Sequence, residues 1–129
     1  MDSDFSAEED ASPNAGPVIW DLSGMMGRLM NDEELVDEVL KEFMLDLPKQ
    51  VEQLERLIAE EDPYQVGRRS HQIKGMAANV GAEALRERAY ELEKAGTAGD
   101  MELIRRKVST LSAILEETQS VIRRHLDAS

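Results

Sequence analysis

The sequence predicts an all-α protein, an up-and-down antiparallel four-helix bundle with an additional short N-terminal helix. Apolar residues recur at three- and four-residue steps through several long stretches, and no stretch alternates as a strand would. The apolar content is 41% but the aromatic content only 4%, which suits aliphatic helix packing. Short breaks separate the stretches, so we expect consecutive helices to be antiparallel neighbours.

The first two helices are expected before residue 60. Asp21 can cap a short helix that is weakened by two glycines. Asn31 and Glu34 resemble a capping pair at the start of the next helix, whose apolar period continues to Ile58. Pro48 interrupts this period, and we expect it to bend the helix without changing which face is buried.

The other three helices have recognisable start signals. Asp62 and the proline after it are typical of an N-cap and a first helical position, and they begin a helix over residues 63–80. Gly81 makes the turn into a helix over residues 82–95, and a break with two glycines follows. Asp100 caps the last helix, which extends to the end of the bundle.

Length and charge limit the function classes. A chain of 129 residues is expected to form one domain, which we place at residues 18–129. Residues 1–17 are acidic and small, and we interpret them as a disordered tail or a linker. The net charge of −12 disfavours nucleic acid and anionic membrane as partners.

The residue types that are missing add further limits. Without cysteine there is no disulfide framework, and two distant histidines give no convincing metal site. No apolar run approaches the roughly 20 residues of a membrane span, and the N-terminus lacks the features of a signal peptide. We therefore expect a soluble, cytoplasmic protein that acts as a monomer.

His71 is the strongest candidate for a functional residue. Its helix has a seam of apolar or small residues that would face the core: Val66, Ser70, Ile73, Ala77 and Val80. His71 is one step off this seam and should point outward, with Gly67 and Gly75 one turn away and Ala78 a further turn along. Lys74 can place a positive charge beside the ring. This pattern fits an imidazole that carries a phosphoryl group.

The charge around His71 differs from that of the whole chain. The segment from Gly67 to Gly75 contains Arg68, Arg69 and Lys74 but no acidic residue. A basic patch in an acidic protein suggests a phosphate, an acidic pocket on a partner, or both. The alternative is that the two arginines only form part of a solvent-exposed helix face and have no role in binding.

The stretch resembles the signature H-x-x-K-G-x-x-x-x-x-G of the histidine phosphotransfer (HPt) domain, here formed by His71, Lys74, Gly75 and Gly81. The likeness continues through Ala82, Leu85, Leu92 and Glu93. It covers most of the chain, because the helix lengths on both sides also fit. The resemblance implies that His71 accepts a phosphoryl group on Nε2 from a receiver-domain aspartate and passes it to another.

The resemblance also implies roles for neighbouring residues. Lys74 would contact the phosphoryl oxygens, and Gly75 would let a partner backbone approach. Docking would use the face with Gly67, Gly75 and Ala78. The short N-terminal helix would add apolar contacts from Met25, Met26 and Leu29. Thr97 stands where many family members have a basic residue, and Arg68 is the substitute cation that we expect.

Glu93 is the candidate partner for Nδ1 of His71. A hairpin that turns at Gly81 places Glu93 near the level of His71, where it would orient the ring. The alternative is an exposed glutamate that pairs with a base of its own helix, Arg86, Arg88 or Lys94. His125, the other histidine, is expected to be a solvated surface group.

The partners implied by the resemblance are response-regulator receiver domains, a hybrid histidine kinase, or both. Such a partner would bring Mg²⁺, so no intrinsic cofactor is expected. The chain has no nucleotide-binding motif and no visible means of phosphorylating itself from ATP, so we expect a carrier rather than an enzyme. Two alternatives stay open. One is a helical adaptor without phosphorylation; the other is the phosphotransfer module of a larger chemotaxis-type kinase, although the chain's end soon after the last helix favours a free-standing protein.

Overall fold

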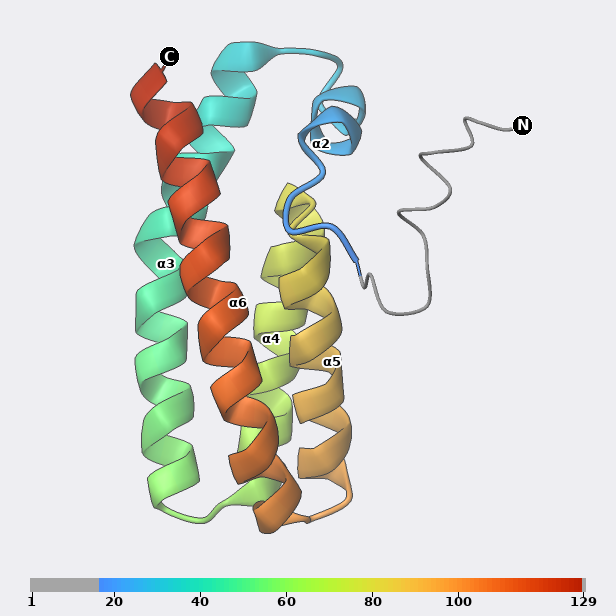
Figure 1. Ribbon diagram of the computed structural model, residues 1–129, viewed down its shortest axis with the longest axis vertical. Coiled ribbons are helices and arrows are strands. Elements are labelled where there is room, and N and C mark those ends of the chain that lie inside the picture. Colours follow the sequence, from blue (N-terminus) through green and yellow to red (C-terminus); the bar gives the residue numbers. More distant parts are fainter. Residues whose placement is uncertain (1–16, 129) are drawn as a thin grey trace, which may run out of the picture.

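The computed structural model describes residues 17–128, and that part of the chain contains helices but no strand. The predicted tail lies outside the described residues, apart from Pro17. The helices are α2 (Leu22–Arg28), α3 (Glu33–Ala59), α4 (Pro63–Val80), α5 (Glu83–Thr97) and α6 (Met101–Ala128). Figure 1 shows α3 to α6 side by side as four long rods, with α2 at one end. The predicted four-helix bundle with a short extra helix is confirmed.

The core lies between the four long helices. Each of them contacts two neighbours, because α4 lies between α3 and α5 while α6 closes the ring against α5 and α3. The predicted seam of α4 is buried throughout: Val66, Ser70, Ile73, Ala77 and Val80. α3 remains helical through Pro48, and Leu47 and Leu54 on either side of it are both buried. The apolar period therefore predicted the buried faces correctly.

Three of the predicted caps are present. The side chains of Asp21, Asp62 and Asp100 each accept a hydrogen bond from the backbone N–H three residues later, at 2.9, 3.2 and 3.0 Å. These bonds satisfy donors that the first turn of a helix leaves without a partner. The start of α4, which carries His71, therefore lies at the predicted residue.

The predicted cap of α3 is wrong by one residue. Asp32, not Asn31, accepts the capping bond from the N–H of Leu35, at 3.1 Å. Asn31 instead has a φ of 58°, and Met30 before it has 59°. Both residues form the tight turn after α2, so the chain is not positioned for capping until Asp32.

The turn at Gly81 connects α4 to the N-terminal segment. Gly81 ends α4 with a φ of +80°, and an added Cβ would meet the carbonyl oxygen of Asp21 at 2.7 Å. The N–H of Asp21 donates to the carbonyl of Gly81 and the indole N–H of Trp20 to that of Val80, both at 2.8 Å. Glycine is required here for its conformation and for the close approach, and α2 is held against the end of the histidine helix.

The packing of α2 corrects the predicted docking role of Met25. Met25 is fully buried, and Met26 and Leu29 are partly buried against the core. A helix this short has little stability of its own and is held by burying its apolar side. Met30, in the turn after α2, is 88% exposed.

His125 is not the solvated surface group that we predicted. Its ring is half-buried and packs edge-on against Trp20, with 5.3 Å between ring centroids. Its Nε2 lies 3.3 Å from Oδ1 of Asp37 on α3. The contact with Trp20 arises because the N-terminal segment folds back beside the end of α6, which the local sequence does not show.

No helix among residues 17–128 combines the length and the apolar character needed to cross a membrane.

Candidate functional site

His71 lies near the middle of α4 and is exposed, with 64% of its side chain accessible. Nδ1 is 2.9 Å from Oε2 of Glu93 on α5. A carboxylate can only accept, so this distance assigns the proton to Nδ1. Nε2, on the other edge of the ring, is the nitrogen left for chemistry. The predicted outward direction of His71 and its proximity to Glu93 are both confirmed.

Lys74 completes a cluster of three residues. Its Nζ is 2.8 Å from Oε1 of Glu93, so each carboxylate oxygen contacts one partner. Glu93 is 23% exposed and Lys74 is 26% exposed, whereas the imidazole is largely open. We call His71, Lys74 and Glu93 the His71 cluster. The lysine lies beside the histidine as predicted, but it is held by Glu93.

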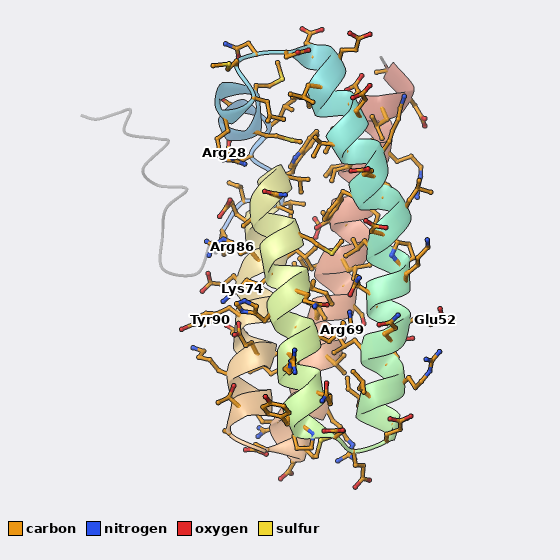
Figure 2. The ribbon with its side chains drawn as sticks, turned by 180° about the vertical axis from the view of Figure 1, so that it is seen from behind. Arg28, Glu52, Arg69, Lys74, Arg86 and Tyr90 are labelled. Atoms are coloured by element: carbon orange, nitrogen blue, oxygen red, sulfur yellow. The ribbon has the colours of Figure 1, made fainter. Side chains whose placement is uncertain are left out.

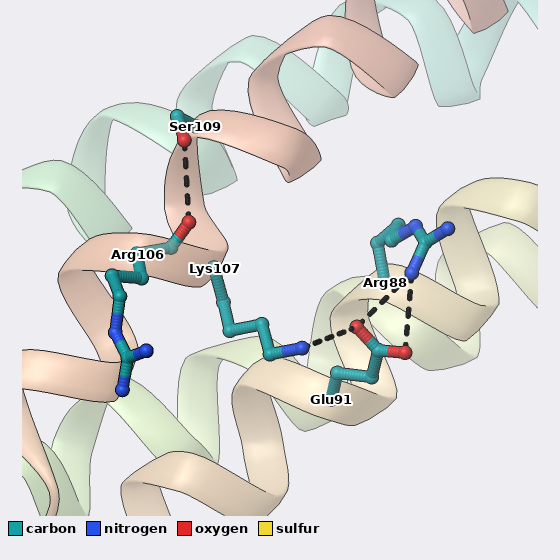
Figure 3. A network of polar contacts seen from close by, with 5 residues as sticks. All are labelled: Arg88, Glu91, Arg106, Lys107 and Ser109. Atoms are coloured by element: carbon teal, nitrogen blue, oxygen red, sulfur yellow. Dashed lines mark hydrogen bonds and ion pairs between the residues drawn. The ribbon is translucent and has the colours of Figure 1, made fainter.

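The alternative partners of Glu93 are otherwise engaged. Arg86 pairs with Glu83 at 2.9 Å. Figure 3 shows the guanidinium of Arg88 donating to the carboxylate of Glu91. Glu91 also pairs with Lys107, and this pair joins α5 to α6. Lys94, the third alternative, lies over the Tyr90 ring, 4.5 Å from its centroid. These contacts leave Glu93 to act across the α4–α5 interface.

The pKa of Glu93 reflects two opposing influences. Burial raises the pKa of this carboxyl, but the hydrogen bonds and charges of Lys74 and His71 outweigh it and bring the pKa below the ordinary 4.5. Glu93 is therefore ionised at neutral pH and can hold both partners.

This lowered pKa gives a prediction for acid solution. A depressed pKa means that the contribution of the His71 cluster to stability is complete above about pH 4.5 and is lost as pH falls through the lower folded-state value. We expect the Glu93 carboxyl ¹³C resonance to titrate below 4.5. In Lys74→Ala its midpoint should move upward. Equal midpoints in the two proteins would show that Lys74 does not influence the carboxylate.

The close approach of α4 and α5 depends on two glycines. An added Cβ at Gly96 would lie 2.6 Å from the backbone nitrogen of Gly67 and 2.6 Å from the carbonyl oxygen of Pro63. The two backbones therefore touch. Gly67 is one turn before His71, and Gly96 is three residues after Glu93, so this contact brings the two side chains within reach.

The position of these glycines corrects two predictions. Gly67 is buried against α5, so its missing side chain serves helix packing rather than an open docking face. Gly96 was expected to break α5, but the helix continues to Thr97. A signal for this was present, because Leu92, Ala95 and Gly96 continue the buried period of the helix.

The rest of the predicted docking face is open. Gly75 and Ala78 are exposed, and a Cβ added at Gly75 would meet nothing within 4 Å. Arg68 is also exposed, on the turn before His71. The surface beside the histidine is hollowed, and the lining residues come from α4 and α5: Tyr64, Gly67, Arg68, His71, Gln72, Glu93 and Thr97. The His71 ring thus borders a surface hollow and is itself 64% exposed.

Sequence reasoning missed two tyrosines at the site. Tyr64 is 64% exposed and contributes to the hollow; its spacing of two turns from His71 was a usable signal. Tyr90 is 42% exposed and lies against Lys74, as Figure 2 shows for these two labelled side chains. Its place three residues before Glu93 put it on the same face of α5.

Residues 17–128 contain no group of three or more histidine, aspartate or glutamate side chains that could hold a metal ion. The only carboxylate of the His71 cluster already has two partners.

Similar proteins were found among family models, curated sequences and solved structures. A family model described as the Hpt domain matches residues 38–121. The chain is 29% identical over 123 residues to the virulence sensor protein BvgS of Bordetella bronchiseptica, covering 94% of this chain and 10% of that protein. It is likewise 29% identical over 115 residues to BvgS of Bordetella parapertussis, covering 85% of this chain and 9% of the relative. The chain thus spans about a tenth of the length of these relatives.

A solved structure has the same fold. The chain is similar to histidine-containing phosphotransfer protein B (HptB) from Pseudomonas aeruginosa PAO1, with a TM-score of 0.80. The match covers 86% of this chain and 96% of the other, at 17% sequence identity.

Proposed function

The chain belongs to the Hpt domain family, and from this membership we propose that Nε2 of His71 carries a phosphoryl group in a phosphorelay. In this function a histidine accepts the group from one receiver-domain aspartate and yields it to another. One observation supports His71 as the carrier. Its ring is 64% exposed while Nδ1 is bonded to Glu93, which leaves Nε2 facing solvent with its lone pair.

Transfer requires no net gain or loss of a proton by the ring. The lone pair of Nε2 forms the N–P bond while the bond from phosphorus to the aspartyl oxygen breaks, and the carboxylate leaves with that electron pair. Nδ1 keeps its proton, so the ring becomes positively charged. Glu93, at 2.9 Å, stabilises this charge. In the return step a second carboxylate attacks phosphorus, and Nε2 recovers its lone pair.

Lys74 supplies positive charge to the phosphoryl oxygens. We expect Lys74→Ala to slow transfer by about tenfold to a hundredfold, because a cation that stabilises charge in the transition state is lost. The free energy of unfolding should change by less than about 1 kcal/mol, because the pair with Glu93 is partly solvated. Stopped-flow transfer to a receiver domain, together with urea unfolding, measures both quantities. Unchanged transfer rates would show that the positive charge of Lys74 does not contribute to phosphoryl transfer.

The partner would be a receiver domain of a response regulator or of a hybrid histidine kinase. Gly75 and Ala78 leave the backbone of α4 open beside the histidine, and Arg68 provides positive charge for an acidic pocket. Mg²⁺ would come with that partner, since Glu93 is occupied by Lys74 and His71. We propose no intrinsic cofactor and no ATP-dependent kinase activity for this chain, and a monomer that acts in the cytoplasm.

A second arrangement is favoured by the relatives. The chain matches about a tenth of each BvgS sensor protein, so the same domain occurs as a part of a much longer chain. The phosphotransfer chemistry is identical in a free carrier and in such a module. The two differ in whether the receiver domain is supplied by the same polypeptide.

The function is tested with a chemical donor and then with a protein partner. Potassium phosphoramidate, which phosphorylates imidazole, should give one ³¹P resonance of a phosphohistidine that is labile in acid and stable in base. Adding an Mg²⁺-loaded receiver domain from the same genome should discharge that resonance. A chain that takes no phosphoryl group from phosphoramidate or from a labelled receiver domain would contradict the proposal.

A further inference from the structure

Two groups on α5 hold the Lys74 ammonium group. Its Nζ is 2.8 Å from Oε1 of Glu93 and 4.9 Å from the centroid of the Tyr90 ring. Tyr90 and Glu93 are three residues apart and share one face of α5, opposite Lys74 on α4. Figure 2 shows Lys74 and Tyr90 together on this side of the bundle. The lysine is therefore only 26% exposed.

The two contacts differ in charge. An aromatic ring face attracts a cation through its quadrupole but carries no net charge. A second carboxylate at this position would also hold the lysine, yet it would repel an incoming phosphoryl group. Lys94 lies 4.5 Å from the same ring centroid, one turn after Tyr90, and adds positive charge at this spot. The ring thus gathers cations near His71 without adding negative charge.

We propose that Tyr90 is a positioning residue for Lys74, and this rests on the function proposed above. When His71 carries a phosphoryl group, the oxygens of that group compete with Glu93 for the ammonium. Lys74 then leaves the carboxylate while the Tyr90 ring keeps it beside the histidine. Glu93 remains on Nδ1, where it stabilises the charged ring. Tyr90 acts through Lys74 and does not touch the reacting atoms.

The test uses the full chain, three single variants and one double mutant. Tyr90→Leu removes the ring, Tyr90→Phe keeps the ring and removes only the hydroxyl, and Lys74→Ala serves as the background for a double mutant. The protein phosphorylated with phosphoramidate is mixed with increasing concentrations of an Mg²⁺-loaded receiver domain. The maximal transfer rate and the half-saturating receiver concentration are then read separately.

We expect Tyr90→Leu to lower the maximal rate by about two- to fivefold with an unchanged half-saturating concentration. Tyr90→Phe should transfer like the unchanged protein. In the Lys74→Ala background, Tyr90→Leu should have no further effect, because the group that it positions is absent. Wild-type rates in Tyr90→Leu, or an equal loss with and without Lys74, would overturn the proposal. So would a change confined to half-saturation, which would identify Tyr90 as a docking contact.

A second readout does not depend on phosphorylation. In the unphosphorylated protein the ring should shift the Lys74 Hε resonances upfield, and Tyr90→Phe should keep this shift while Tyr90→Leu abolishes it. Loss of the shift together with unchanged transfer kinetics would refute the positioning role alone. A wild-type chain that shows the shift but accepts no phosphoryl group would refute the proposed function, and the inference with it.

Discussion

Replacement of His71 by glutamine is expected to lower phosphoryl acceptance by more than about a thousandfold, because the nucleophile is removed. Glutamine is neutral and polar, and the position is 64% exposed, so the bundle should fold unchanged. The measurement is the incorporation of ³²P from a labelled receiver domain, with circular dichroism to show that the helices are intact.

The chain offers a matched control for this substitution. It has two histidines, and His125 lies against Trp20 and Asp37 at the end of α6, away from the His71 cluster. The variant His125→Gln should therefore accept the full amount of label. Equal labelling of His71→Gln and the unchanged protein would exclude His71 as the carrier. Labelling lost only in His125→Gln would identify His125, rather than His71, as the phosphoryl carrier.

Replacement of Gly96 by alanine is expected to lower the free energy of unfolding by about 2 kcal/mol. Alanine gains about 1 kcal/mol of helix propensity over glycine. The added Cβ, however, would lie 2.6 Å from backbone atoms of Gly67 and Pro63, and such overpacking costs about 3 kcal/mol. The clash is with backbone, so it is relieved only by moving α4 away from α5. Urea unfolding measures the stability.

The same movement should disturb the site. Separation of α4 from α5 lengthens the 2.9 Å contact of His71 with Glu93, so the proton should no longer favour Nδ1, and the ring ¹⁵N shifts of His71 report this change. Gly75→Ala is the control, because a Cβ there meets nothing within 4 Å. It should raise the stability by up to about 1 kcal/mol and leave the ring shifts unchanged. If both variants had the same stability, the glycine contact would not limit the interhelical distance.

Helix positions followed from local information. The proline after Asp62 and the glycine at position 81 fixed both ends of α4, because each residue has a conformational preference that needs no tertiary partner. The apolar period then placed His71 off the buried seam. The sequence also predicted that Glu93 on α5 lies at the same height along the bundle as His71 on α4. An antiparallel hairpin brings together residues that are at similar distances from its turn.

Errors arose where a side chain or backbone meets another helix. The spacing of apolar residues along a helix shows which face is buried. It does not show which neighbouring helix covers that face or how closely the two helices approach. Gly67 and Gly96 were therefore assigned to an open face and to a helix break, although they touch each other. His125 was expected in solvent because its contact with Trp20 joins segments far apart in the chain.

The sequence by itself determined the helices, their buried faces, the outward histidine and the carboxylate that reaches it. These depend on backbone preferences and on periodicity, which act within a few residues. Only the tertiary structure decided how near α4 lies to α5, and so that Lys74 rests between Glu93 and Tyr90. Contacts of this kind depend on the distance and rotation between two helices, which the packing of the whole bundle sets.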